Sequence, residues 1–118
     1  MPNEKEVKTI TDKQEINRII QEKINGKKLI FTDYYYFGID KRGLTHERVL
    51  EIFPHFEKVF AIETETLKFG DLGYELFYEI SGNISFSIAT CPKDDKILII
   101  HAVEYKRSLE KRIKKFKR

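Results

Sequence analysis

The chain has 118 residues, of which 41% are hydrophobic and 35% are charged, and its net charge is +3. This length supports one core but is too short for two ordinary domains, so we expect residues 1–118 to form a single domain. The single cysteine excludes an intramolecular disulfide, and no apolar run approaches the roughly 20 residues that span a bilayer. We therefore expect a cytoplasmic protein that does not enter a membrane.

The charge is distributed unevenly along the chain. Residues 104–118 contain eight lysines and arginines and two glutamates, a net charge of +6, so residues 1–103 carry −3. A basic end on a mildly acidic body is typical of proteins that bind a polyanion. RNA or another polyanion is therefore the expected partner.

The N-terminal third predicts one helix. Residues 1–10 show no periodicity, and we expect them to be disordered or extended. Thr11 and Gln14 then have capping-box spacing, which predicts that Thr11 begins a helix. An apolar stripe follows, and Asn25-Gly26 ends the helix because both residues tolerate a left-handed backbone. The stripe consists of Ile16, Ile19, Ile20 and Ile24.

The next segment predicts two shorter helices. Residues 29–31 are apolar and could form either a strand or a buried connector. Thr32 predicts the N-cap of a helix that Gly43 ends, although the run of aromatic residues would also suit a strand over 28–37. A third, short helix is predicted after Thr45.

From residue 58 onward the hydrophobic period changes to two, which predicts a sheet. We expect strands at 59–66, 74–80, 84–89 and 96–103. The last of these is apolar on both faces, so we place it at the centre of the sheet. Ser108 predicts the start of a basic helix over 108–118. The predicted fold is α+β, a four-stranded antiparallel sheet packed by N-terminal helices, with a basic C-terminal helix.

Metal and nucleotide motifs are missing from the sequence. The glycines do not form a phosphate-binding loop, and the three histidines and one cysteine lack the spacing of metal ligands. We therefore expect neither a cofactor nor a metal ion.

His101 is a candidate catalytic residue, because it interrupts the most hydrophobic strand just before Tyr105, Lys106 and Arg107. Imidazole exchanges protons near neutral pH, and cations stabilise the pentavalent phosphate that forms when a 2′-hydroxyl attacks. These residues are candidates for RNA cleavage. The alternative is that His101 is a hydrogen-bonded core residue.

The basic residues predict a nucleic-acid surface, with a solvated helix face as the alternative. Tyr34, Tyr35 and Tyr36 could stack on exposed bases, but we expect at most one of them outside the core. The predicted nucleic-acid-binding residues are Arg42, Lys106, Lys111, Arg112, Lys114 and Lys115.

Two segments carry a resemblance to a known group of proteins. Residues 31–53, FTDYYYFGIDKRGLTHERVLEIF, combine a Thr-capped helix, Arg-Gly-Leu and a second Thr-capped helix. Residues 74–106 contain YELFYEISGN and KILIIHAVEYK, an antiparallel meander whose last strand, of the type Ile-x-His-Ala, leads into basic residues. Together these segments resemble small proteins akin to RelE/ParE-type toxins.

The resemblance implies a toxin-like, metal-independent endoribonuclease that is neutralised by an antitoxin-like protein. It implies that His101, Tyr105 and Arg107 are catalytic, and that Arg42 and Lys106 hold phosphate.

The chain departs from that group at two places. The related proteins commonly begin their first helix with His and carry Arg one turn later, where this chain has Tyr34 and Gly38. The departure leaves open a non-catalytic protein that binds nucleic acid or a partner through its basic C-terminal helix. A homodimer or a homo-oligomeric structural protein is a third candidate.

Overall fold

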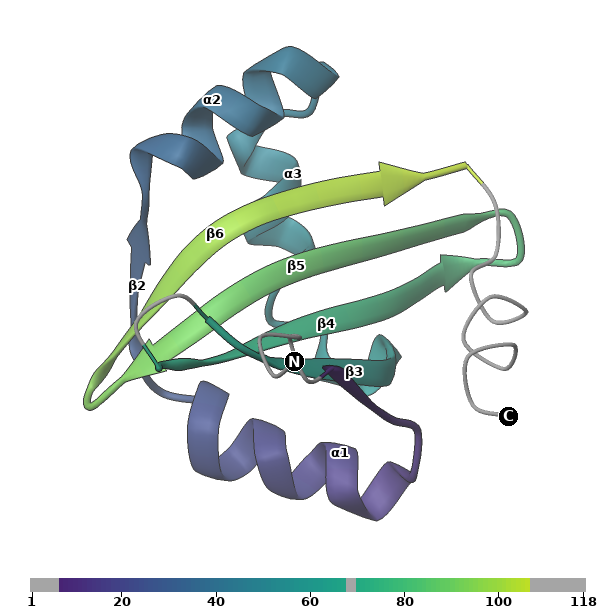
Figure 1. Cartoon of the computed structure of the whole chain (residues 1–118). Helices are drawn as coiled ribbons and strands as arrows, with labels where there is room; N and C mark the ends of the chain where they lie inside the picture. The colour runs from purple at the N-terminus through teal and green to yellow at the C-terminus, as the bar shows by residue number, and fades with distance from the viewer. Residues whose placement is uncertain (1–6, 68–69, 107–118) are drawn as a thin grey trace, which may run out of the picture.

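The computed structural model describes residues 7–67 and 70–106, which form one six-stranded sheet and three α-helices (Figure 1). In chain order the strands are β1 (Val7–Ile10), β2 (Lys28–Phe31), β3 (Val59–Thr66), β4 (Leu72–Ser81), β5 (Ile84–Lys93) and β6 (Lys96–Tyr105). The helices are α1 (Lys13–Ile19), α2 (Asp33–Arg42) and α3 (His46–Ile52). A π-helical turn (Ile20–Ile24) follows α1, and a 3-10 turn (Phe56–Lys58) precedes β3.

The predicted four-stranded antiparallel sheet is wrong. The strand order is β1-β3-β4-β5-β6-β2, in which β1 extends the sheet antiparallel to β3 and β2 extends it parallel to β6. The sheet is therefore mixed. Both added strands are short and pair with residues far away in the sequence, so they lack the local alternation that marks a half-buried strand. The predicted basic helix over 108–118 lies outside the described residues.

The position predicted for the last strand also needs correction. β4 and β5 occupy the centre of the sheet, whereas β6 lies next to the edge strand β2. The side chains of β6 that face the core, Ile97, Ile99 and Ala102, are buried, whereas Leu98 and Ile100 on the other side are only partly buried. An apolar sequence on both faces therefore does not by itself place a strand at the centre of the sheet.

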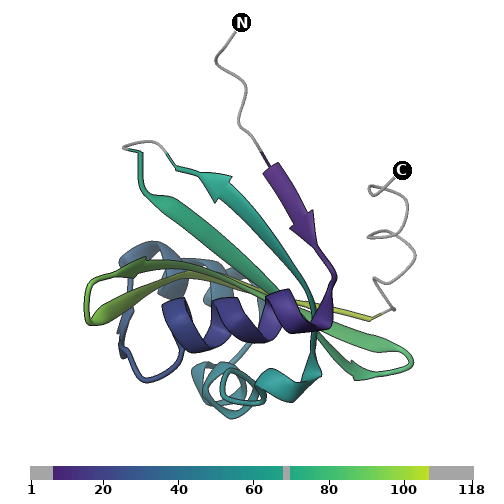
Figure 2. The ribbon, with the colours of Figure 1, turned by 90° about the horizontal axis from the view of Figure 1, so that it is seen from below.

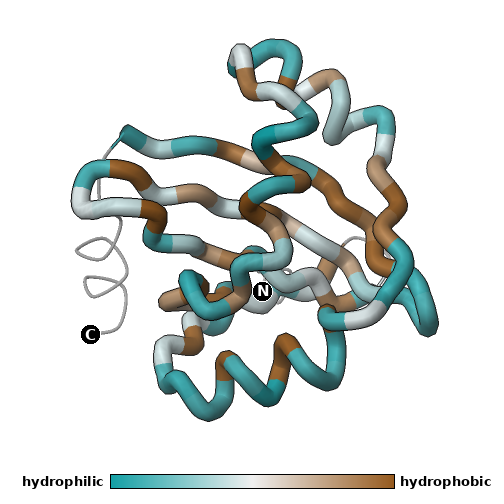
Figure 3. Tube along the Cα trace, turned by 180° about the vertical axis from the view of Figure 1, so that it is seen from behind, coloured by the Kyte–Doolittle hydropathy of each residue, from teal (hydrophilic) through white to brown (hydrophobic). Residues whose placement is uncertain are grey.

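Helix α1 begins one residue later than predicted, because Asp12 and not Thr11 is its N-cap. The Asp12 carboxylate accepts a hydrogen bond from the Glu15 N–H at 2.9 Å. The predicted apolar stripe is correct, and its four isoleucines are buried in the main core. Figure 3 shows hydrophobic (brown) segments of this helix on its side toward the sheet.

The aromatic segment after β2 is helical, as its capping residues predict. The Thr32 hydroxyl accepts a hydrogen bond from the Tyr35 N–H at 3.0 Å, and Gly43 ends α2 with a φ of +69°, which favours glycine. The Tyr35 hydroxyl lies 2.8 Å from Nδ1 of His46 and joins α2 to α3. Burial is the main cause that raises the pKa of Tyr35 to about 12.

The two faces of the sheet differ in the helices that pack against them. Helices α1 and α3 lie on one face, where the main core forms (Figure 2). The opposite face, called the open face below, is not covered by α1 or α3, and α2 lies beside it next to β6. Side chains on the open face can therefore line a surface site.

Candidate active site

A β-bulge in β6 lies next to His101. Ile99 pairs with Thr90 of β5, whereas His101 pairs with Ala89. Ile100 is therefore an extra residue on β6, opposite the step from Ala89 to Thr90. A bulge of this kind shifts the alternation of side chains by one position.

The bulge decides which way His101 points. In an unbroken strand, His101 would share the face of Ile97 and Ile99, which are buried in the main core. Because Ile100 is inserted, Ala102 joins the core instead and His101 turns to the open face. The alternative of a hydrogen-bonded core histidine is therefore wrong.

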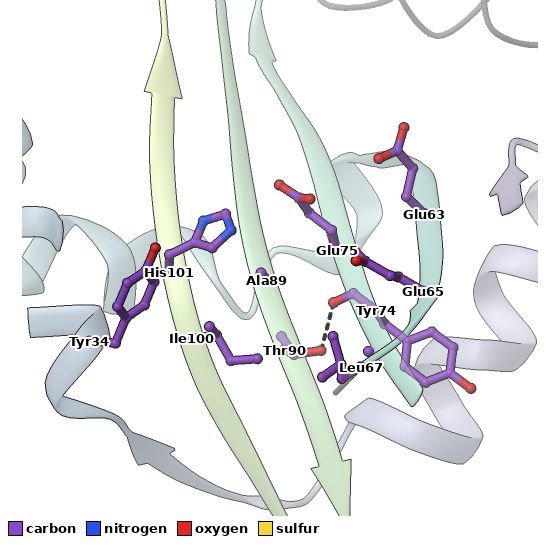
Figure 4. A pocket seen from close by; sticks show the side chains of 11 residues that line it. Tyr34, Glu63, Glu65, Leu67, Tyr74, Glu75, Ala89, Thr90, Ile100 and His101 are labelled. Atoms are coloured by element: carbon purple, nitrogen blue, oxygen red, sulfur yellow. Dashed lines mark hydrogen bonds between the residues drawn. The ribbon is translucent and has the colours of Figure 1, made fainter. Parts of the chain in front are cut away.

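His101 belongs to a row of four residues that crosses the open face. Glu63 of β3 pairs with Glu75 of β4, Glu75 pairs with Ala89, and Ala89 pairs with His101. Because adjacent strands lie about 4.8 Å apart, the backbones at Glu75 and His101 are about 10 Å apart. Figure 4 shows their side chains pointing toward each other across the small Ala89.

A hollow of about 230 Å³ lies over this row. Small residues make room for it, because Ala89 leaves the space between Glu75 and His101 unfilled. Gly73 also lines the hollow, and its missing side chain leaves space for Leu67, because a Cβ there would lie 3.2 Å from the Leu67 side chain. The side chains that line the hollow include Tyr34, Glu63, Glu65, Leu67, Glu75 and His101 (Figure 4).

The imidazole of His101 is held in a poorly solvated position. Its Nδ1 atom is buried and has no hydrogen-bond partner among the described residues. Burial lowers the pKa of His101 below its usual 6.5, Glu75 raises it, Arg42 lowers it and Glu65 raises it, with a net shift downward. The ring is therefore neutral at neutral pH and able to accept a proton.

Arg42 acts on His101 through its positive charge, and its side chain folds back along α2. One guanidinium nitrogen, Nη1, lies 2.7 Å from the position that a Cβ would occupy on Gly38. Tyr34 lies one turn before Gly38 and lines the same hollow as His101. Tyr34, Gly38 and Arg42, at i and i+4 spacing, form one stripe on α2, called the α2 stripe below.

The structure separates His101 from Tyr105, the other predicted catalytic residue that lies in the described part of the chain. Tyr105 is also on the open face, but four residues further along β6, or about 13 Å, and it packs against Ala61 and Phe77. Lys106 is exposed and is the last described residue. The predicted residues Arg107, Lys111, Arg112, Lys114 and Lys115 lie outside the described part of the chain.

The sequence reasoning missed Glu75. Its position between the buried Tyr74 and Leu76 marks it as an open-face residue, but only the strand register places it opposite His101. The expectation for the tyrosines was also wrong. Tyr35 is fully buried, whereas Tyr34 and Tyr36 are 64% and 46% exposed.

The described residues do not support a metal site, an activated cysteine or a membrane-spanning helix. Within residues 7–67 and 70–106, there is no group of three His, Cys, Asp or Glu side chains arranged to hold a metal ion. Cys91 is buried, and burial is the main cause that raises its pKa, so its thiol is not activated. None of the described helices is long and apolar enough to cross a membrane.

Comparisons with known proteins found no similar protein. Neither a protein-family model, nor a curated protein, nor a solved structure matches the chain. Function is therefore inferred from the chemistry of the hollow.

Proposed function

We propose that the protein is a metal-independent endoribonuclease in which His101 is the general base. The observation that carries the proposal is that a neutral imidazole and the Glu75 carboxylate line one hollow, while the charge of Arg42 lies close enough to lower the pKa of that imidazole. Cleavage of RNA by its own 2′-hydroxyl needs a proton acceptor and positive charge near the phosphate. His101 and Arg42 meet these two needs.

In the proposed reaction, His101 accepts the proton of the 2′-hydroxyl while the 2′-oxygen attacks phosphorus. The bond from phosphorus to the 5′-oxygen breaks, which leaves a 2′,3′-cyclic phosphate and a 5′-hydroxyl. The Tyr34 phenol, which lines the same hollow, donates a proton to the leaving oxygen and regains it from His101 through solvent. Glu75 stabilises the imidazolium, because a nearby carboxylate favours the charged form.

The carboxylates restrict where the phosphate can lie. Glu63 and Glu65 lie on β3, at the far side of the hollow from α2. Phosphate is repelled from that side by like charge. The scissile phosphate is therefore expected on the α2 side, between His101 and Arg42.

The direct test is incubation of the purified protein with RNA in excess EDTA, followed by detection of 2′,3′-cyclic phosphate ends. We expect the wild type to cleave and His101→Ala, purified in parallel, to lose about a hundredfold or more in rate. The variant also controls for contaminating ribonuclease. Equal behaviour of the two proteins, whether both cleave or neither does, contradicts the proposal.

A second candidate is a non-catalytic role in binding a basic protein partner, such as an antitoxin-like protein. It is favoured by the three carboxylates that line the hollow, which accept hydrogen bonds from a lysine or arginine side chain. In this case Glu75→Gln weakens binding of a basic peptide, and the wild type leaves RNA intact. Cleavage of RNA in EDTA argues against this candidate as the main function.

A further inference from the structure

We infer that the α2 stripe binds an unpaired nucleotide, so that the site takes single-stranded RNA and rejects duplex RNA. The inference rests on the proposed ribonuclease function and adds the class of RNA and the place of one subsite. Tyr34 contacts the base, and Arg42 contacts a phosphate beside it.

The aromatic part of the subsite is Tyr34. Its side chain is 64% exposed, whereas that of the neighbouring Tyr35 is fully buried. An aromatic ring left in solvent at the mouth of a hollow offers a flat surface on which a base can stack. Because Tyr34 and His101 line the same hollow, a base on Tyr34 lies next to the proposed general base.

The cationic part of the subsite is Arg42, and Gly38 gives it room. The guanidinium lies over Gly38, where a Cβ would lie 2.7 Å from Nη1, so that a larger residue would make the guanidinium move away. A planar guanidinium presents several N–H donors to a phosphate at once. A glycine inside a helix makes the helix less stable than an alanine would. The space that Gly38 leaves for the Arg42 side chain is a functional reason for glycine at this position.

A second aromatic and cationic pair lies beside the stripe. Phe37 is 67% exposed, and Nζ of Lys41 lies 5.7 Å from the centre of its ring. The pair offers a contact to the next nucleotide of an extended strand. The helix also carries Asp33 and Asp40, so its net charge is zero and stacking is expected to contribute more than overall charge.

These features select an unpaired strand. Bases inside a duplex are stacked on each other, and their faces cannot reach Tyr34 or Phe37. A single strand can turn one base onto Tyr34 while its phosphate meets Arg42.

The test is fluorescence anisotropy with a labelled 2′-O-methyl RNA, which lacks the attacking hydroxyl and cannot be cleaved by the proposed route. We expect the single strand to bind at least about tenfold more tightly than its duplex. Tyr34→Ala weakens single-strand binding by roughly 5- to 100-fold, whereas Tyr34→Phe retains it. Gly38→Ala also weakens binding, and Leu50→Ala, at an exposed apolar position on α3, is the matched control with no effect.

Three results overturn the inference: equal affinity for single strand and duplex, no binding to either, or wild-type affinity in Tyr34→Ala. The cleavage assay in EDTA separates the two proposals. Single-strand binding without cleavage removes the ribonuclease function but leaves the subsite. If the wild type cleaves RNA but Tyr34→Ala binds the single strand with wild-type affinity, the subsite is ruled out and the ribonuclease function stands.

Discussion

The hydroxyl of Thr32 donates a hydrogen bond to the carbonyl oxygen of Ile99 at 3.3 Å, and the Thr32 N–H donates to the same oxygen at 3.3 Å. The hydroxyl also accepts the hydrogen bond from Tyr35 that begins α2. One residue therefore starts the helix and fixes it to β6, two positions before His101. The spacing between the α2 stripe and the imidazole depends on this contact.

Thr32→Ala is expected to lower the free energy of unfolding by about 1 kcal/mol and to change the NMR titration of His101. Thr45→Ala is the matched control, because the Thr45 hydroxyl caps α3 by accepting a hydrogen bond from the Arg48 N–H at 3.2 Å, a contact within α3. Thr45→Ala should lower the free energy of unfolding by a similar amount, while the NMR titration of His101 stays as in the wild type. The same change of titration in both variants would show that Thr32 does not position the site.

Gly38→Ala should raise the pKa of His101 toward 6.5, because a methyl group displaces the Arg42 guanidinium that helps to lower it. Helix stability should rise by up to about 1 kcal/mol, since alanine is the better helix former. Arg42→Gln should raise the pKa similarly, and the double variant should add little. An unchanged pKa in Gly38→Ala would rule out this role for Gly38.

Glu75→Gln should lower the pKa of His101 further, because the Glu75 carboxylate raises it. Cleavage should slow by roughly tenfold or more, since the imidazolium that forms in the reaction loses the carboxylate that stabilises it. Glu51→Gln is the control, as Glu51 is on α3 and paired with Arg48. Glu75 is not part of the site if both variants cleave RNA at the wild-type rate.

Stability should depend on pH through His101. Its folded pKa lies below the unfolded value near 6.5, so the unfolded state binds more protons between these two values. The free energy of unfolding therefore rises with pH across this range. The contribution of His101 to stability is lost as the pH falls through the same range. Denaturant unfolding at several pH values should show this slope in the wild type and a smaller one in His101→Asn. An identical slope in the variant would assign the effect to other groups.

Local signals in the sequence predicted the helices well. Thr32 and Thr45 are the N-caps of α2 and α3, and Gly43 ends α2, because capping depends on residues within one turn. The edge strands were predicted only in part, since a strand at 29–31 was one of two alternatives and the pairing of both edge strands is with distant residues. Leu29 of β2 pairs with Ile97 of β6, and nothing close to either residue reports that contact.

The candidate site was predictable only in part. His101 attracted attention as a titratable residue in an apolar strand, but its orientation depends on the bulge at Ile100, which arises from pairing with β5. In the predicted resemblance to toxins, which no comparison supports, Gly38 stands where an arginine was expected. The structure places the guanidinium of Arg42 over that glycine, which sequence position alone does not reveal.

The most direct test of His101 as the general base compares two pH titrations of the same protein. One is the rate of RNA cleavage in EDTA, and the other is the NMR signal of the His101 imidazole. The account predicts that the rate rises with pH and levels off at the pKa of His101, below 6.5, and that Gly38→Ala shifts both curves upward together. A rate that is independent of pH in this range, or that levels off at a value unrelated to His101, would contradict it.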